Sequence, residues 1–149
     1  MRRRPNVYAL CPATRAESDA LFAIHREALG VYVEQTWGPW DDARQRDYWG
    51  EHWPSTRQVI LVDDELAGFL DVEPRAGAVH VGNIELSPAV QGRGIGTAIL
   101  RAVQAAAKAE NKSVGLQVLK VNPARRIYVR LGFKDVGETE THFQMEWRG

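Results

Sequence analysis

The sequence predicts an α+β domain built around one mixed β-sheet of about seven strands, with about four helices. Strand-like apolar runs and helical patterns follow one another in the order strand, two helices, three strands, helix, strand, helix, two strands. The three central strands are joined by short turns and therefore form an antiparallel meander. The helix that follows them connects two strands that run parallel, because a strand–helix–strand unit requires this.

Length and composition limit what the chain can do. Its 149 residues make one domain, which we place at residues 1–149. Lys plus Arg and Asp plus Glu number 19 each, so no strong field attracts nucleic acid or an anionic membrane. Cys11 is the only cysteine, which excludes an intrachain disulfide and a cysteine-based zinc site, and we expect no metal. The apolar run after the basic start is too short for a signal peptide, so we expect a cytoplasmic protein.

The first strand and helix are expected near the N-terminus. Residues 7–11 form a short apolar strand, and Thr14 with Glu17 has the form of a capping box that begins a helix. Apolar positions then recur at helical spacing and would face a core. They are Leu21, Ile24, His25, Ala28, Leu29, Tyr32 and Val33.

Four tryptophans lie among acidic residues between Glu34 and Trp53. Gly38 and Pro39 interrupt any helix there, and Asp41 or Asp42 can cap a second helix that runs to about Trp53. Each tryptophan is better explained by packing in a core than by contact with a ligand, because tryptophan buries the most apolar surface.

The meander occupies residues 58–62, 65–73 and 78–86, with turns at 63–64 and 75–77. In a regular third strand one set of side chains shares a face of the sheet. This set is Val79, Val81, Asn83 and Glu85. A β-bulge would reset that register.

The remaining elements complete the predicted order. An amphipathic helix covers residues 94–110, and a strand at 114–119 runs parallel to the one before the helix. Asn122 caps a second helix that ends at Gly132. Two strands at 134–136 and 141–147, joined through residues 137–140, close the chain.

A glycine-rich junction between a strand and a helix, residues 91–97, is suited to bind phosphate. Its glycines lack the Cβ atoms that would keep an oxyanion away, and the first amides of the helix have no intrahelical acceptor. No lysine follows Gly96 as in a P-loop, and the glycines are spaced in twos, unlike a dinucleotide fingerprint.

The junction instead fits Gln/Arg-x-x-Gly-x-Gly/Ala through Gln91, Gly94 and Gly96. Residues 122–133 fit a second pattern, Asn-x-x-Ala-x-x-x-Tyr-x-x-x-Gly-Phe. In order and spacing the two motifs resemble those of the GNAT N-acetyltransferase superfamily. The resemblance covers nearly the whole chain and implies a GNAT-type fold, with a mostly antiparallel sheet and helices on both of its faces.

The resemblance further implies an enzyme that uses acetyl-CoA as cosubstrate and acetylates a primary amine by direct attack in a ternary complex. The Leu86 amide would polarise the acetyl carbonyl, and Tyr128 would face the thioester sulfur as general acid. The implied coenzyme contacts are Leu86, Ser87, Gln91, Gly92, Arg93, Gly94, Ile95, Gly96, Thr97, Asn122 and Tyr128. Tyr128 alternatively packs as a core residue, and Asn122 serves as a helix cap.

The general base is less defined. Glu85, near the end of the strand before the glycine-rich junction, is the first candidate, and an exposed surface glutamate is the alternative. Glu34 and His142 are further candidates, whereas Gln117, where some relatives carry a glutamate, cannot usefully accept a proton.

The acceptor is expected to meet Glu34, Trp37, Trp40 and His142. The expected binding partner is a small-molecule or peptide amine, and we expect no binding to nucleic acid or membrane. The chain could also form a homodimer. The alternative function is a non-catalytic acyl-CoA-binding or sensing module that retains the glycine-rich junction without an acid–base pair.

Overall fold

The chain folds around a single seven-stranded sheet in the order β1-β2-β3-β4-β5-β7-β6. The structure, a computed structural model, describes residues 7–149. The strands are β1 (Tyr8–Pro12), β2 (Gln58–Val62), β3 (Glu65–Arg75), β4 (Ala78–Leu86), β5 (Ser113–Leu119), β6 (Lys134–Glu138) and β7 (His142–Trp147). The α-helices are α1 (Ser18–Trp37), α2 (Asp42–Glu51), α3 (Ile95–Ala109) and α4 (Arg125–Arg130). The predicted fold class is confirmed.

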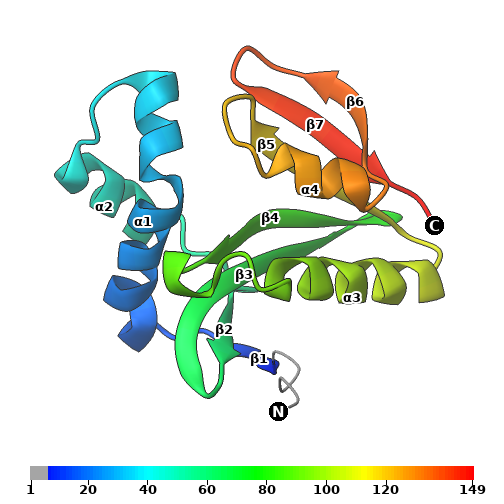
Figure 1. Cartoon of the computed structure of the whole chain (residues 1–149), viewed down its shortest axis with the longest axis horizontal. Coiled ribbons are helices and arrows are strands. Elements are labelled where there is room, and N and C mark those ends of the chain that lie inside the picture. Colours follow the sequence, from blue (N-terminus) through cyan, green and yellow to red (C-terminus); the bar gives the residue numbers. More distant parts are fainter. Residues whose placement is uncertain (1–6) are drawn as a thin grey trace.

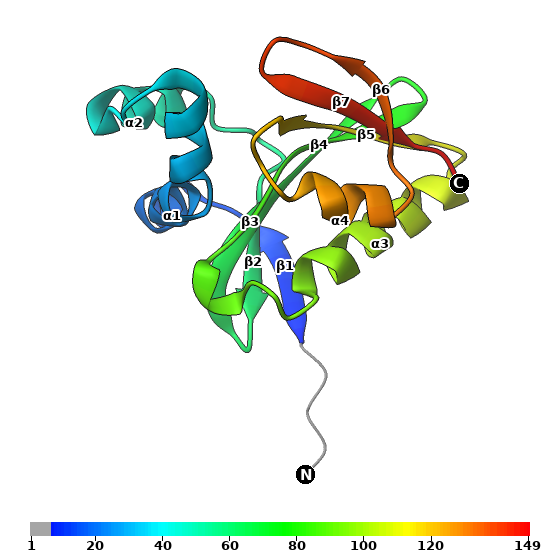
Figure 2. The same cartoon turned by 45° about the horizontal axis from the view of Figure 1, so that its top comes forward.

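Two helical layers cover the sheet (Figures 1 and 2). Helices α3 and α4 lie together on one side, whereas α1 and α2 lie apart from them on the other. The larger core is buried on the α3 and α4 side, where Ile99 and Leu100 pack against the sheet. A smaller core joins Leu21 and Ile24 of α1 to Val59 and Phe69 of the sheet.

The parallel contact between β4 and β5 positions the site. These strands pair only at Ala78–Val81 with residues 113–116, and the other neighbours in the sheet are antiparallel. Past Val81, β4 continues along β3 while β5 continues along β7. The two halves of the sheet therefore separate, and Figure 1 shows β4 diverging from β5 and β7 toward α1. We call this opening the splay.

A bulge at Gly82 decides which side chains face the two helical layers. Asp71 pairs with Asn83 but Val72 pairs with Val81, so Gly82 has no partner on β3. The regular alternation is thereby reset, as a bulge requires. Val79 and Val81 face the larger core together with Ile84 and Leu86. Asn83 and Glu85 consequently turn to the α1 side, opposite Asp71 and Phe69.

Some predicted boundaries are wrong. Gly137 and Glu138, expected in a loop, belong to β6 because they pair with Gln144 and Phe143 of β7. Pairing across the hairpin outweighs the turn preference of glycine. The capping box of Thr14 and Glu17 is present, but it begins a 3₁₀ turn that leads into α1.

Of two other predicted caps, Asp41 is confirmed, whereas Asn122 lies before the N-cap of α4, which is Ala124. The Asp41 carboxylate accepts a hydrogen bond from the Arg44 amide at 3.1 Å, at the start of α2. Asn122 Oδ1 accepts one from the Ala124 amide at 2.9 Å, although the regular α4 begins only at Arg125.

A buried ion pair ties the segment after α2 to the sheet. The Arg57 guanidinium donates from Nε and Nη2 to both carboxylate oxygens of Asp71, at 2.9 and 2.8 Å, and the two residues are 4% and 1% exposed. Asn83 donates a further hydrogen bond to Asp71 at 2.8 Å. The guanidinium carbon lies 4.2 Å from the Trp49 ring centroid and 4.9 Å from that of Trp53. These two tryptophans thus pack within the fold.

Asp71→Asn should lower the free energy of unfolding by about 3–5 kcal/mol, because it leaves the Arg57 charge buried without a counter-ion. Urea unfolding followed by tryptophan fluorescence measures this. Glu73→Gln is the control, since Glu73 meets Arg75 in an exposed ion pair at 3.7 Å and should change stability by less than about 1 kcal/mol. Equal effects of the two substitutions would show that the buried pair contributes little.

Candidate functional site

The glycine-rich junction forms a cradle, which we define as residues 91–97, at the start of α3. Gly92 and Gly94 have φ angles of 75° and 79°, in the left-handed region that favours glycine. The first amide with an intrahelical acceptor is that of Ala98, which donates to Gly94 O at 3.0 Å. The preceding amides of Ile95, Gly96 and Thr97 therefore have no acceptor within the helix and are suited to bind an anion.

The cradle is attached to the end of β4. Gln91 Nε2 donates a hydrogen bond to the Leu86 carbonyl at 2.9 Å, and a Cβ on Gly96 would lie 3.7 Å from the Leu86 side chain. The Ser87 amide donates to Ala67 O on β3 at 2.7 Å. The end of β4 and the start of α3, which hold most of the residues expected to contact the coenzyme, are thus in direct contact, although the Ile95 side chain is buried in the larger core.

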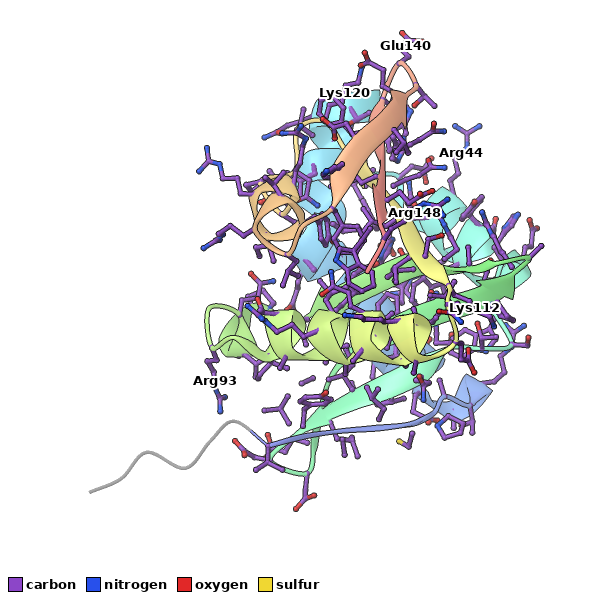
Figure 3. All side chains as sticks on the ribbon, turned by 90° about the vertical axis from the view of Figure 1, so that its right-hand side faces the viewer. Arg44, Arg93, Lys112, Lys120, Glu140 and Arg148 are labelled. Atoms are coloured by element: carbon purple, nitrogen blue, oxygen red, sulfur yellow. The ribbon has the colours of Figure 1, made fainter. Side chains whose placement is uncertain are left out.

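Arg93 lies at the same end of α3, as Figure 3 shows. Its Nη2 atom is 3.3 Å from Asp63 Oδ2, in the turn between β2 and β3. Both side chains are well exposed, so this ion pair contributes little stability. The contact of Arg93 with a coenzyme phosphate stays a prediction.

Gly68 on β3 is a site residue that the sequence analysis did not identify. A Cβ atom there would lie 2.1 Å from the Glu85 carbonyl oxygen, so only glycine permits the close approach of the two strands. This approach fixes the backbone of β4 at Glu85 and Leu86. A glycine inside a strand pattern was the available signal.

Glu85 is buried, at 4% exposure, so the alternative of an exposed surface glutamate is wrong. Its Oε1 atom lies 2.7 Å from His25 Nδ1 of α1. Its Oε2 atom is buried and has no hydrogen-bond partner within residues 7–149. Burial raises the pKa of Glu85 above its ordinary value, and the hydrogen bond from His25 opposes that rise. The site therefore holds a carboxylate with one unpaired oxygen.

His25 was expected only as a core residue on the apolar stripe of α1. It does contact aromatic rings, with ring centroids 5.2 Å from Trp49, 6.0 Å from Trp40 and 6.3 Å from Phe69. Its pairing with Glu85 could not be predicted, because 60 residues separate them in the sequence. A titratable side chain on an otherwise apolar stripe was the only hint.

Tyr128 approaches from α4, on the other helical layer. Its ring meets Phe133 edge to face, with centroids 6.0 Å apart. Burial and then the negative charge of Glu85 raise the pKa of Tyr128 to about 12. The Tyr128 ring packs with the larger core, on the side of the sheet opposite α1. The hydroxyl keeps its proton at neutral pH.

The residues expected to meet the acceptor gather around the C-terminal end of α1. Trp37 is 60% exposed, and its ring centroid lies 6.1 Å from that of His142 at the start of β7. Glu34 Oε1 accepts a hydrogen bond from the Trp40 amide at 3.2 Å, and Trp40 in turn contacts His25. Burial lowers the pKa of His142. The fold thus brings Trp37 and His142 into contact and places Glu34 and Trp40 near the same end of α1, and acceptor binding by these four residues stays a prediction.

Two features are absent from residues 7–149. No three of their histidine, cysteine, aspartate or glutamate side chains gather in a way that could hold a metal ion. None of their helices combines the length and the apolar character needed to cross a bilayer.

Solved structures share this architecture. The PaiA N-acetyltransferase of Thermoplasma acidophilum, solved in complex with coenzyme A, has a TM-score of 0.75 at 17% identity, over 96% of this chain and 99% of that one. An acetyltransferase from Thermus thermophilus has a TM-score of 0.74 at 20% identity, over 95% and 97%. The ribosomal-protein-S18-alanine N-acetyltransferase from Escherichia coli has one of 0.69 at 16% identity, over 95% and 94%. At these identities the likeness shows the fold.

A comparison with curated protein sequences finds no significant match. The model of the acetyltransferase (GNAT) family, in contrast, matches residues 19–133, which is most of the chain and includes both sequence motifs. With the cradle, the splay and the seven-stranded sheet in place, this match shows that the chain belongs to the acetyltransferase (GNAT) family.

Proposed function

We propose that this protein is an acetyl-CoA-dependent N-acetyltransferase that acetylates a primary amine by direct attack in a ternary complex. The observation that carries the proposal is Glu85, a buried carboxyl group with one unpaired oxygen, near the end of the strand that a hydrogen bond from Gln91 joins to the cradle. Tyr128, with a pKa of about 12, keeps its proton at neutral pH and is a suitable acid.

The cradle suits the pyrophosphate of acetyl-CoA. Two left-handed glycines and three amides without intrahelical acceptors offer donors to an anion at a helix N-terminus. The end of β4 beside it would hold the pantetheine arm, and the Leu86 amide would donate to the acetyl oxygen. A preorganised donor of this kind is worth about 3–4 kcal/mol in the transition state.

Glu85 and Tyr128 can complete the proton transfers. Glu85 Oε2 takes a proton from the ammonium group, and the neutral amine then attacks the acetyl carbonyl carbon. As the carbon–sulfur bond breaks, the nitrogen now bonded to the acetyl carbon gives up its second proton to solvent, and the departing thiolate receives a proton from the Tyr128 hydroxyl. The products are the amide and coenzyme A, with Glu85 protonated and Tyr128 ionised until they exchange protons with solvent.

Interaction between Glu85 and Tyr128 favours this order of events. The negative charge of Glu85 helps to raise the pKa of Tyr128. Once Glu85 has accepted the proton of the amine, that contribution disappears and Tyr128 becomes a stronger acid. The base thus makes the acid more effective at the stage when the thiolate leaves.

A covalent acyl-enzyme is not supported. Cys11, the only cysteine of the sequence, lies on β1, at the edge of the sheet and three strands from β4. It packs against the smaller core rather than in the splay. Direct transfer between the two substrates is the route consistent with this placement.

Binding of acetyl-CoA and release of coenzyme A test the proposal. Acetyl-CoA should raise the Tm of the wild-type protein, because a ligand that binds only the native state stabilises it. A panel of polyamines, amino acids, aminoglycosides and peptide N-termini should include an amine that causes release of coenzyme A thiol. Binding without turnover of any amine would favour the non-catalytic acyl-CoA-binding or sensing module.

Gly94→Leu should weaken acetyl-CoA binding at least about tenfold, because loss of one charge-assisted hydrogen bond costs about 1.5–3 kcal/mol. Gly77→Leu is the matched control. Both glycines have left-handed φ angles, of 79° and 67°, and a Cβ on either meets no atom within 4 Å. Both variants should lose similar stability, but only Gly94→Leu should lose the Tm shift. Equal coenzyme affinity in the two variants would rule out the cradle.

A further inference from the structure

His25 of α1 and Glu85 of β4 form a pair inside the molecule. His25 Nδ1 lies 2.7 Å from Glu85 Oε1, and the two side chains are 19% and 3% exposed. When Glu85 is ionised it can only accept a hydrogen bond, so in that state Nδ1 carries the proton of this contact. The contact occupies one oxygen of Glu85 and leaves Oε2 unpaired.

The His25 ring is held in place by its surroundings. Rings of Phe22, Trp40, Trp49 and Phe69 lie around it, with centroids between 5.2 and 6.3 Å away. These rings come from several elements, since Trp49 belongs to α2 and Phe69 to β3. The imidazole therefore offers Nδ1 to Glu85 in a fixed orientation.

We propose that His25 is a positioning residue for the base: through Nδ1 it holds Glu85 Oε1, keeps the carboxylate ionised, and leaves Oε2 for the proton of the amine. This inference rests on the proposed function of Glu85. His25 is not assigned to contact either substrate.

The charges around Glu85 explain why such a partner is needed. Asp71 on β3 adds a negative charge that opposes ionisation of Glu85, as burial does. Arg57, before β2, favours ionisation, but Nε and Nη2 bond Asp71, and Nη1 makes no hydrogen bond within residues 7–149, to Glu85 or to any other group. Tyr128 of α4, with a pKa of about 12, is uncharged at neutral pH and adds no positive charge that would favour ionisation. His25 is the group that donates a hydrogen bond directly to the carboxylate.

Two substitutions separate the hydrogen bond from the ring. In His25→Asn the side-chain amide nitrogen takes the place of Nδ1 and can still donate to Oε1. In His25→Phe the ring remains but the donor is lost. His52→Asn is the control, because His52 is exposed on α2's C-terminal side and bonds only the Tyr48 carbonyl within the described chain, at 2.9 Å.

The first test is an NMR titration of the Glu85 side-chain carboxyl carbon in the protein without substrates. We expect the Glu85 pKa to rise by at least about one unit in His25→Phe, because a hydrogen bond to the charged form is lost. In His25→Asn and His52→Asn it should stay near the wild-type value. An unchanged pKa in His25→Phe, or an equal rise in His25→Asn, would overturn the proposal. His25→Leu replaces His25→Phe if the latter does not fold.

The second test is the pH dependence of kcat/KM. The acidic limb should move to higher pH in His25→Phe by the amount found by NMR, which lowers the rate about tenfold per unit on that limb. The KM for acetyl-CoA should not change, since His25 lies outside the cradle. A shifted pKa with an unmoved limb would refute the role of His25 in catalysis. Absence of turnover in the wild type would refute the proposed function instead, and the NMR result would still stand.

Discussion

Glu85→Gln should lower kcat/KM by about 10²–10⁴ near neutral pH, the range expected when a positioned proton acceptor is removed. A glutamine cannot take the proton of the ammonium group. Burial raises the pKa of Glu85 above its ordinary value of 4.5, so the wild-type enzyme should lose activity as the pH falls through that raised pKa. This acidic limb should be missing from the variant. A series of pH–rate measurements with the best amine tests both expectations.

The stability of Glu85→Gln supplies the control for folding. A carboxyl whose pKa is raised in the folded state stabilises the protein below its unfolded pKa, and this stability is lost as the pH rises through the folded pKa. At pH 7 the buried carboxylate is therefore at a disadvantage that glutamine does not share. Glu85→Gln should remain folded at pH 7, which thermal unfolding checks. Low activity of a folded Glu85→Gln protein would then result from the loss of the proton acceptor and not from unfolding.

The same pH series on Glu34→Gln and His142→Gln decides between the candidate bases. Both residues belong to the group expected to meet the acceptor, but Glu34 bonds the Trp40 amide and His142 bonds Thr141, whereas Glu85 is paired with a half-buried histidine. We expect both variants to keep the acidic limb. If the acidic limb of the pH profile were lost only in Glu34→Gln or only in His142→Gln, that residue would be the base. If Glu85→Gln, Glu34→Gln and His142→Gln all kept the limb, the amine would arrive neutral or lose its proton to water.

The local parts of the site could be predicted from the sequence. The cradle depends on consecutive residues, since glycine conformation and free helix-end amides are properties of a short segment. The cap of α2 at Asp41 is equally local. The parallel pairing of β4 and β5 also followed from the order of elements, whereas the splay beyond Val81 is known only from the structure.

Long-range pairings could not be predicted. His25 and Glu85 are 60 residues apart, and the face on which Glu85 lies depends on the bulge at Gly82. Without that bulge Glu85 would share a face with Val81, in the larger core. The ion pair between Arg57 and Asp71 likewise depends on how the segment after α2 packs on the sheet. Tertiary packing determines such contacts, and a single sequence carries little trace of it.

Tyr128→Phe should reduce turnover by about 10²–10⁴ while the affinity for acetyl-CoA changes little. The variant removes only the hydroxyl, so the edge-to-face contact with Phe133 and the packing of α4 are retained. With a pKa of about 12, Tyr128 is protonated throughout the range in which Glu85 titrates, so the variant should lose rate without losing the acidic limb. Steady-state kinetics and the Tm shift with acetyl-CoA measure the two effects separately.

Tyr48→Phe provides the matched control, because Tyr48 is 62% exposed on α2 and its ring stacks on His52 rather than near the splay. It should retain wild-type turnover. If Tyr128→Phe did so as well, Tyr128 would be a packing residue of α4, and the thiolate would have to obtain its proton from solvent. A second comparison uses a thioester whose leaving thiol is more acidic than that of coenzyme A. A better leaving group needs less help from an acid, so a smaller rate loss of Tyr128→Phe with this thioester than with acetyl-CoA would identify the Tyr128 hydroxyl as the proton donor.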